Sequence, residues 1–228
     1  AMTTYFVKWN IKEIFPNLAS NDLMSIFTPV IGILPAIAMA VGLFAAPFLI
    51  KKFEKRNVLL IGCLWGVLAN VIFYFVGYEN IYVFTIGRFI SFLPVGIWMS
   101  VTTIMIGDSV DDLQYKTGRR LEGTCFSLLT FIGKFQNGVN VALTGMILSA
   151  IGYVGTLDAD FEQQSRFTLQ GIFIMVTLVP ALGFLLMGIP FIFYDFTKSK
   201  HEAILLALKE KGILEKEQEV KDEQNLEF

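Results

Sequence analysis

Histidine and cysteine, which most often bind metals or act as nucleophiles, are nearly missing from this chain. The one histidine, His201, lies in a charged stretch, and the two cysteines, Cys63 and Cys125, lie in or beside apolar runs. A histidine without a second ligand nearby excludes a zinc site and a histidine-dependent catalytic triad. Cysteines placed in this way are typical of packing. The sequence therefore indicates that the protein is not an enzyme and needs no cofactor.

Charged residues are also scarce, at 17% of the chain with a net charge of -2. No stretch is rich in lysine and arginine without interleaved acids, which argues against a nucleic-acid partner. Apolar residues fill the chain instead: 54% are hydrophobic, 22 are phenylalanine, and the mean hydropathy is +0.61. This composition favours the lipid bilayer as the solvent.

Long apolar runs recur along the chain and predict membrane-spanning helices. Each has the roughly 20 residues that a crossing requires. The predicted spans are residues 23–50, 58–76, 81–106, 124–151 and 171–194. Residues 1–9 are typical of the end of a further apolar helix, and no methionine-led start precedes them, so we expect the polypeptide to begin upstream. The predicted fold class is an all-α polytopic membrane helical bundle.

The positions of lysine and arginine predict the orientation. Residues 51–57, residues 107–123 and the charged tail 195–228 fall on one side of the membrane and hold most of the basic residues near span ends. The positive-inside rule places that side, and with it the C-terminus, in the cytoplasm, for a protein of the cell (inner) membrane. Five spans and a truncated helix make six, which is one half of a transporter built from repeats.

The polar segment 107–123 is the first candidate functional region, because so many charges beside two spans are costly unless they pair or face water. Asp108 and Asp111 lie one helical turn apart and can oppose Arg119, Arg120 or Glu122. Ion pairs that form in only one state of a transporter suit a cytoplasmic gate. The alternative is a solvated loop whose charges only set the topology.

Lys134 is the second candidate, because it lies near the middle of the predicted span 124–151. An ionised side chain on the lipid face there costs about 2.5–3.5 kcal/mol, so we expect it to face the transporter interior. Asn137 and Asn140 continue a stripe from Lys134 that either lines a wet cavity or bonds neighbouring helices. For Lys134 the alternative is snorkelling to the nearer interface.

Other membrane residues carry weaker signals. Trp98 can stack on the apolar face of a solute, although packing is the more common role of a membrane tryptophan. Arg88 is expected to extend to the outer interface, with an external gate pair as the alternative. The glycines of span 124–151 are expected to let another helix approach closely.

The segment from Asp108 to Lys134 resembles the loop and following helix of the glycoside-pentoside-hexuronide (GPH) cation symporter family, the melibiose-permease-like branch of the major facilitator superfamily. That family has an acidic pair, a Lys-x-Gly-x-Arg-x-Glu-Gly pattern, a membrane lysine and a closing Gly-Tyr. The matching residues are Asp108, Asp111, Lys116, Gly118, Arg120, Glu122, Gly123, Ser127, Lys134, Gly152 and Tyr153. Asp112 and Gln114 depart from it, where tyrosine and often glutamate are usual.

The resemblance implies the C-terminal half of a major-facilitator-type symporter, in which Na+ or H+ moving down its gradient drives uptake of a sugar or glycoside. It places Lys134 near the substrate and ion site, with Asn137 and Trp98 as further candidates. The coupling cation and most sugar contacts would come from the N-terminal six-helix half, the expected partner. The alternatives are a non-transporting membrane sensor or assembly subunit, and a transporter of a non-sugar solute.

Overall fold

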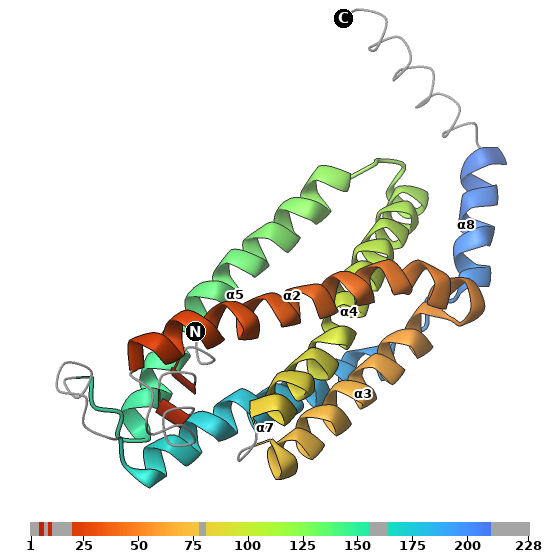
Figure 1. Cartoon of the computed structure of the whole chain (residues 1–228). Coiled ribbons are helices and arrows are strands. Elements are labelled where there is room, and N and C mark those ends of the chain that lie inside the picture. The colour runs from red at the N-terminus through yellow and green to blue at the C-terminus, as the bar shows by residue number, and fades with distance from the viewer. Residues whose placement is uncertain (1–4, 7–8, 11–19, 78–80, 156–163, 211–228) are drawn as a thin grey trace, which may run out of the picture.

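The structure is a computed structural model, and it describes residues 5–6, 9–10, 20–77, 81–155 and 164–210. All regular secondary structure in these ranges is helical. The helices, shown in Figure 1, are α2 (Ser20–Lys52), α3 (Lys55–Val76), α4 (Ile81–Thr117), α5 (Glu122–Ala150), α7 (Arg166–Ile192) and α8 (Lys198–Glu210). Residues 5–6 and 9–10 are also helical, and the rest of the predicted helix end at 1–9 and of the tail at 195–228 lies outside the described residues.

Within the described residues, four helices are long and apolar enough to cross a membrane. They are Gly32–Lys52 of α2, α3, Val83–Thr117 of α4, and α7. These helices confirm the predicted all-α membrane bundle with several spans. α5 matches the predicted span 124–151 in position but is not among the four, because Lys134, Asn137 and Asn140 interrupt its apolar sequence. That α5 crosses the bilayer stays a prediction.

Helix α4 is the centre of the bundle. It packs against α2 and α3, and α3 in turn packs against α7. α5 has only a small contact with α4 and is exposed along most of its length. In Figure 1, α5 (green) begins beside the end of α4, and this first part of α5 extends away from the other helices. The described part of the chain therefore leaves one helix nearly without partners.

Two clusters of buried side chains hold the ends of the bundle. The first is aromatic and joins the start of the chain, α3, α4 and α7: Phe6 stacks on Phe84 with ring centroids 4.0 Å apart, and Phe73 lies 5.1 Å from Phe84. The second lies at the opposite end, where Ala46, Val58, Leu59, Val101 and Met105 join α2, α3 and α4. Close aromatic pairs add about 0.5–1.5 kcal/mol each beyond their burial.

The close approach of α2 and α4 depends on two glycines. A Cβ atom added to Gly42 would overlap the Leu93 carbonyl oxygen, and one added to Gly96 would overlap that of Met39. By contrast, no atom lies within 4 Å of a Cβ added to Gly133, Gly138 or Gly145. The close packing expected at the glycines of α5 is therefore not formed within the described chain, and glycine-mediated packing occurs between α2 and α4.

The connection between α5 and α7 is held by side-chain hydrogen bonds. Gln164 donates to the Val154 carbonyl at 2.8 Å and accepts from its N–H at 3.3 Å. Thr168 donates to the Ile151 carbonyl at 2.8 Å, and Ser165 caps α7 by accepting from the Thr168 N–H at 3.2 Å. These contacts bring the end of α5 to the start of α7.

Helix α4 continues past residue 106, the predicted end of its span, and through much of the polar segment 107–123. It ends only at Thr117, and a left-handed Gly118 (φ 70°) follows. Asp108, Val110 and Gln114 are buried in this extension, whereas Ser109 and residues 115–117 are exposed. Most of the charges of the segment are thus carried on a rigid helix.

Candidate functional site

Two adjoining cavities lie between α4, α5 and α7. Their volumes are about 440 Å³ and about 490 Å³, and both are lined by Val95, Pro180 and Phe184. Membrane helices with polar groups aimed at a common cavity are typical of a solute pathway. These cavities are the candidate substrate site.

The 440 Å³ cavity carries the more polar lining. Its polar lining comes from α3, α4 and α5 and consists of Asn70, Arg88, Ser91 and Asn140. Arg88 is only 6% exposed, and its Nη1 donates to the Val176 carbonyl at 3.3 Å while its guanidinium lies 4.5 Å from the Phe92 ring centroid. The expectation that Arg88 extends to the outer interface is therefore wrong, because a carbonyl and an aromatic face inside the bundle hold it.

The 490 Å³ cavity contains the predicted residue Trp98. Its indole Nε1 is buried and has no hydrogen-bond partner among the described residues. Gln136 of α5 lines the same cavity opposite. A buried N–H donor without a partner is costly unless a ligand or water accepts from it. This pair of side chains offers an aromatic face, one donor and an amide to a solute.

Lys134 and Asn137 do not line either cavity. Both are exposed, and no hydrogen bond or ion pair of their side chains is formed within the described part of the chain. Since successive helix residues turn by about 100°, Lys134 points roughly opposite to Gln136, with Asn137 between Lys134 and Asn140. The structure thus divides the predicted stripe: Asn140 faces the cavity, and Lys134 faces away from α4 and α7.

An ion-pair cluster lies at the other predicted site, the end of α4. Asp108 is 5% exposed and accepts from Lys55 Nζ at 2.5 Å. His201 of α8 bridges both acids of the predicted pair, with Nδ1 3.6 Å from Asp108 Oδ1 and Nε2 3.1 Å from Asp111 Oδ2. Three helices therefore meet at two carboxylates.

The arginines and Glu122 complete part of this cluster. Arg120 lies 4.0 Å from Asp111 and donates from Nε to Glu122 at 3.0 Å. Its Nη1 also donates to buried Gln114 at 3.4 Å. Arg119 is exposed and its side chain has no ion pair with a described residue. The structure brings together Asp108, Asp111, Arg120 and Glu122, and leaves Arg119 outside.

Helix α8 is fixed in place by contacts on both sides of His201. Leu208 is fully buried, and the Lys198 N–H donates to Glu54 at 3.3 Å. Lys200 donates to Asp195 at 2.5 Å, and this hydrogen bond lowers the pKa of that carboxyl. No sequence signal indicated that His201 would reach Asp111, 90 positions away.

Together, the apolar helices and the polar cavity within their bundle define a multi-pass membrane protein. Residues 18–198 match the model of the MFS/sugar transport protein family, so the chain belongs to that family. The resemblance to GPH symporters within the major facilitator superfamily is thereby confirmed.

Several curated proteins are similar to the chain. An isoprimeverose transporter of Lactiplantibacillus pentosus is 32% identical over 198 residues, which are 86% of this chain and 38% of that protein. The symporter YjmB of Bacillus subtilis (strain 168) is 30% identical over 213 residues, 93% of this chain and 43% of that protein. A glucuronide carrier protein homolog of Escherichia coli (strain K12) is 28% identical over 71% of this chain and 34% of its own length. The chain thus spans about two fifths of the length of such relatives.

Proposed function

We propose that this chain is the C-terminal half of a secondary active transporter that carries a sugar or glycoside together with Na+ or H+. The observation that carries the proposal is the pair of cavities between α4, α5 and α7. The kinship with an isoprimeverose transporter and a glucuronide carrier homolog supports a sugar-like substrate. In this proposal the protein lies in the cell (inner) membrane with its C-terminus in the cytoplasm.

The cavity chemistry suits a polyhydroxylated solute. A sugar ring has an apolar face of C–H groups and an edge of hydroxyls that donate and accept hydrogen bonds. Trp98 supplies an aromatic face and a buried donor, while Gln136, Asn140 and Asn70 supply amides. A few convergent polar groups in a mostly apolar cavity are the usual arrangement of a small-molecule site.

The exposed side of α5 supports a partner half. Lys134 and Asn137 lie on it, and an ammonium at this depth requires a carboxylate or water. In the proposed complete transporter the N-terminal half covers this side, supplies the carboxylates and binds most of the cation and sugar. The two halves then rock about a midplane site.

The ion-pair cluster at the end of α4 is proposed as part of the cytoplasmic gate. Its pairs connect α3, α4, α8 and the turn before α5. Exposed pairs contribute about 0–1 kcal/mol each, and a buried pair costs more to break when one partner is lost, about 3–5 kcal/mol. An ion pair that exists in only one of the two states shifts the equilibrium towards that state by the free energy of the pair.

Uptake by the full-length protein tests the proposal. Cells without related carriers would express it and receive labelled isoprimeverose, glucuronides and neutral glycosides, with and without a Na+ or H+ gradient. We expect gradient-dependent uptake of at least one glycoside and at least a tenfold loss in Trp98→Ala, if its stacking and hydrogen bond together are worth about 1.4 kcal/mol. Lys209→Gln, on the exposed side of α8, is the matched surface control.

Two results would favour the alternatives. Gradient-driven uptake of a lipid or other non-sugar solute, with none of any glycoside, would keep transport and change the substrate. No uptake of any solute by a correctly inserted full-length protein would favour a sensor or assembly subunit.

A further inference from the structure

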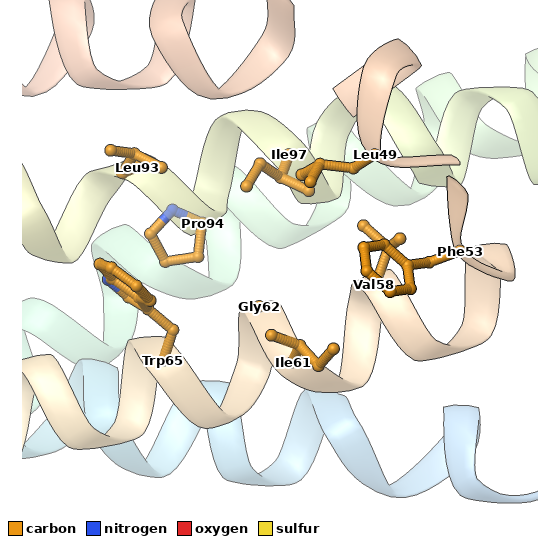
Figure 2. Close-up of a pocket in the computed structure, with 9 residues that line it drawn as sticks. All are labelled: Leu49, Phe53, Val58, Ile61, Gly62, Trp65, Leu93, Pro94 and Ile97. Atoms are coloured by element: carbon orange, nitrogen blue, oxygen red, sulfur yellow. The ribbon is translucent and has the colours of Figure 1, made fainter. Parts of the chain in front are cut away.

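An apolar groove runs along the opposite side of the bundle from the polar cavities. Its volume is about 240 Å³, and Figure 2 shows α2, α3 and α4 contributing its walls. The lining residues are Leu49, Phe53, Val58, Ile61, Gly62, Trp65, Leu93, Pro94 and Ile97. All of them are apolar apart from the indole N–H of Trp65, which donates to the Ile90 carbonyl at 3.3 Å.

The groove faces outward from the bundle. Ile61 is 57% and Trp65 51% exposed, whereas Leu59 and Cys63, on the other side of α3, are buried. On α4 the groove residues Leu93 and Ile97 lie on a different face from Trp98 and the other cavity residues, since 100° per residue separates the two sets by roughly half a turn. In a membrane-spanning bundle this outward apolar face contacts lipid.

Two lysines end α2 near one end of the groove: Lys52 lies beside the groove residue Phe53, and Lys51 Nζ lies 5.8 Å from the ring centroid of neighbouring Phe48. Lys51 and Lys52 end α2, and both are exposed. Lys52 Nζ lies 5.6 Å from the ring centroid of Phe53, which itself lines the groove. Neither ammonium has an ion pair with any residue that the structure describes. Within the described residues this end therefore carries two ammonium groups without an anionic partner.

The neighbouring cations are already engaged. Lys55 donates to Asp108 at 2.5 Å, and Arg56 donates to the Ile192 carbonyl at 2.6 Å. The start of α3 thus uses its two basic residues to hold the bundle. Lys51 and Lys52 remain for a ligand beside the groove.

We propose that the groove binds an acyl chain of an anionic phospholipid from the leaflet at the Lys51–Lys52 end, and that these two lysines hold its headgroup phosphate. The apolar walls match a hydrocarbon chain, and the charge at the mouth matches a headgroup with a net negative charge. Basic residues at the end of a membrane helix attract anionic lipids in this way. A zwitterionic lipid offers the same chain without the net charge, so the site selects the headgroup.

Trp65 provides a reporter inside the groove. Bromine atoms on an acyl chain quench indole fluorescence only at short range, and the difference in emission between the protein and Trp65→Phe isolates Trp65. The full-length protein would be placed in phosphatidylcholine vesicles containing a small fraction of brominated phosphatidylglycerol or brominated phosphatidylcholine. We expect phosphatidylglycerol to quench Trp65 with a relative association constant on the order of tenfold higher, as two lysines predict.

Two variants test the two parts of the site. Lys51→Gln with Lys52→Gln should remove the preference for phosphatidylglycerol. Gly62→Leu should fill the groove and weaken quenching by both lipids; a Cβ there meets nothing closer than Pro94 Cβ at 3.8 Å, so the backbone need not move. The matched controls are Lys198→Gln with Lys209→Gln, on α8, and Gly32→Leu, where nothing lies within 4 Å.

Three outcomes would overturn the proposal. Equal quenching by the two lipids would show that the lysines select no headgroup. Unchanged preference in the double lysine variant, whose residues are exposed and not needed for folding, would show the same. Absence of Trp65 quenching by either lipid would show that another part of the full-length protein covers the groove.

Discussion

Asp108 is the residue on which the ion-pair cluster at the end of α4 depends, because it contacts Lys55 from α3 and His201 from α8 while nearly buried. A buried carboxylate with two cationic or hydrogen-bonding partners holds both elements to α4. Hydrogen bonds to charged groups contribute about 1.5–3 kcal/mol each. The attachment of α8 therefore rests on very few side chains.

Asp108→Asn should loosen α8 from α4. We expect the amide hydrogens of Lys198–Glu210 to exchange about tenfold faster or more, since the lost free energy corresponds to at least that factor. Hydrogen exchange followed by mass spectrometry measures this. Asp112→Asn is the control, because Asp112 pairs with exposed Lys116 four residues along the same helix. Equal exchange in both variants would show that Asp108 does not hold α8.

Gradient-driven uptake should depend on the positive charge of the side chain at position 134 and not on the length of that side chain. If Lys134 pairs with carboxylates of the other half, Lys134→Gln should lower gradient-driven uptake at least tenfold, and Lys134→Arg should retain more of it. Uptake is compared at equal amounts of inserted protein. If Lys134→Gln transports at the normal rate, the side chain merely reaches the interface from an exposed position.

At the scale of elements, α2 and α4 form the tightest helix pair, and their contact depends on glycines, which have no side chain. Gly42 and Gly96 face each other's helix so closely that a methyl group would overlap backbone oxygens. In a bilayer, where helices gain little by hiding apolar surface from lipid, such close packing supplies much of the association free energy.

Gly96→Ala should weaken this helix pair. The overlap with the Met39 carbonyl must be relieved by moving the backbone, which costs about 1–3 kcal/mol and should lower the unfolding temperature in detergent. Gly107→Ala, on the same helix with open space around it, should be neutral or raise the temperature slightly. A Gly96→Ala protein as stable as the Gly107→Ala protein would contradict the packing argument.

Helix α5 shows how an element can be recognised from sequence while its surroundings are not. Its apolar length and its end near Ile151 follow from local composition and from Gly152, which takes a left-handed φ of 71°. Its glycines suggested close packing, yet no described atom approaches Gly133, Gly138 or Gly145. A small residue permits contact but does not choose the helix that makes it.

At the scale of the whole molecule, the orientation of the bundle follows from its basic ends. The connection after α5 and the start of α8 lie at opposite ends of α7, so they must lie on opposite sides of the membrane if α7 crosses it. The positive-inside rule then predicts that α8 lies in the cytoplasm.

Labelling with a membrane-impermeant maleimide checks this orientation. In a Cys63→Ala, Cys125→Ala background, Val154→Cys should react on intact cells, because Val154 is 44% exposed beyond α5. Lys198→Cys, at the exposed start of α8, should react only after the membrane is opened. The reverse pattern would invert the topology and remove the proposed cytoplasmic gate.

The sequence by itself determined the membrane class, the family and the positions of most helices, because hydropathy and the charged motif between Asp108 and Lys134 are local properties. Only the tertiary structure decided which distant side chains meet. Lys55 and His201 join Asp108 from 53 and 93 positions away, and Arg88 is buried beside Val176 rather than extended outward. Helix packing sets these contacts through shape and burial across the bundle, and neither is encoded in the neighbourhood of any one residue.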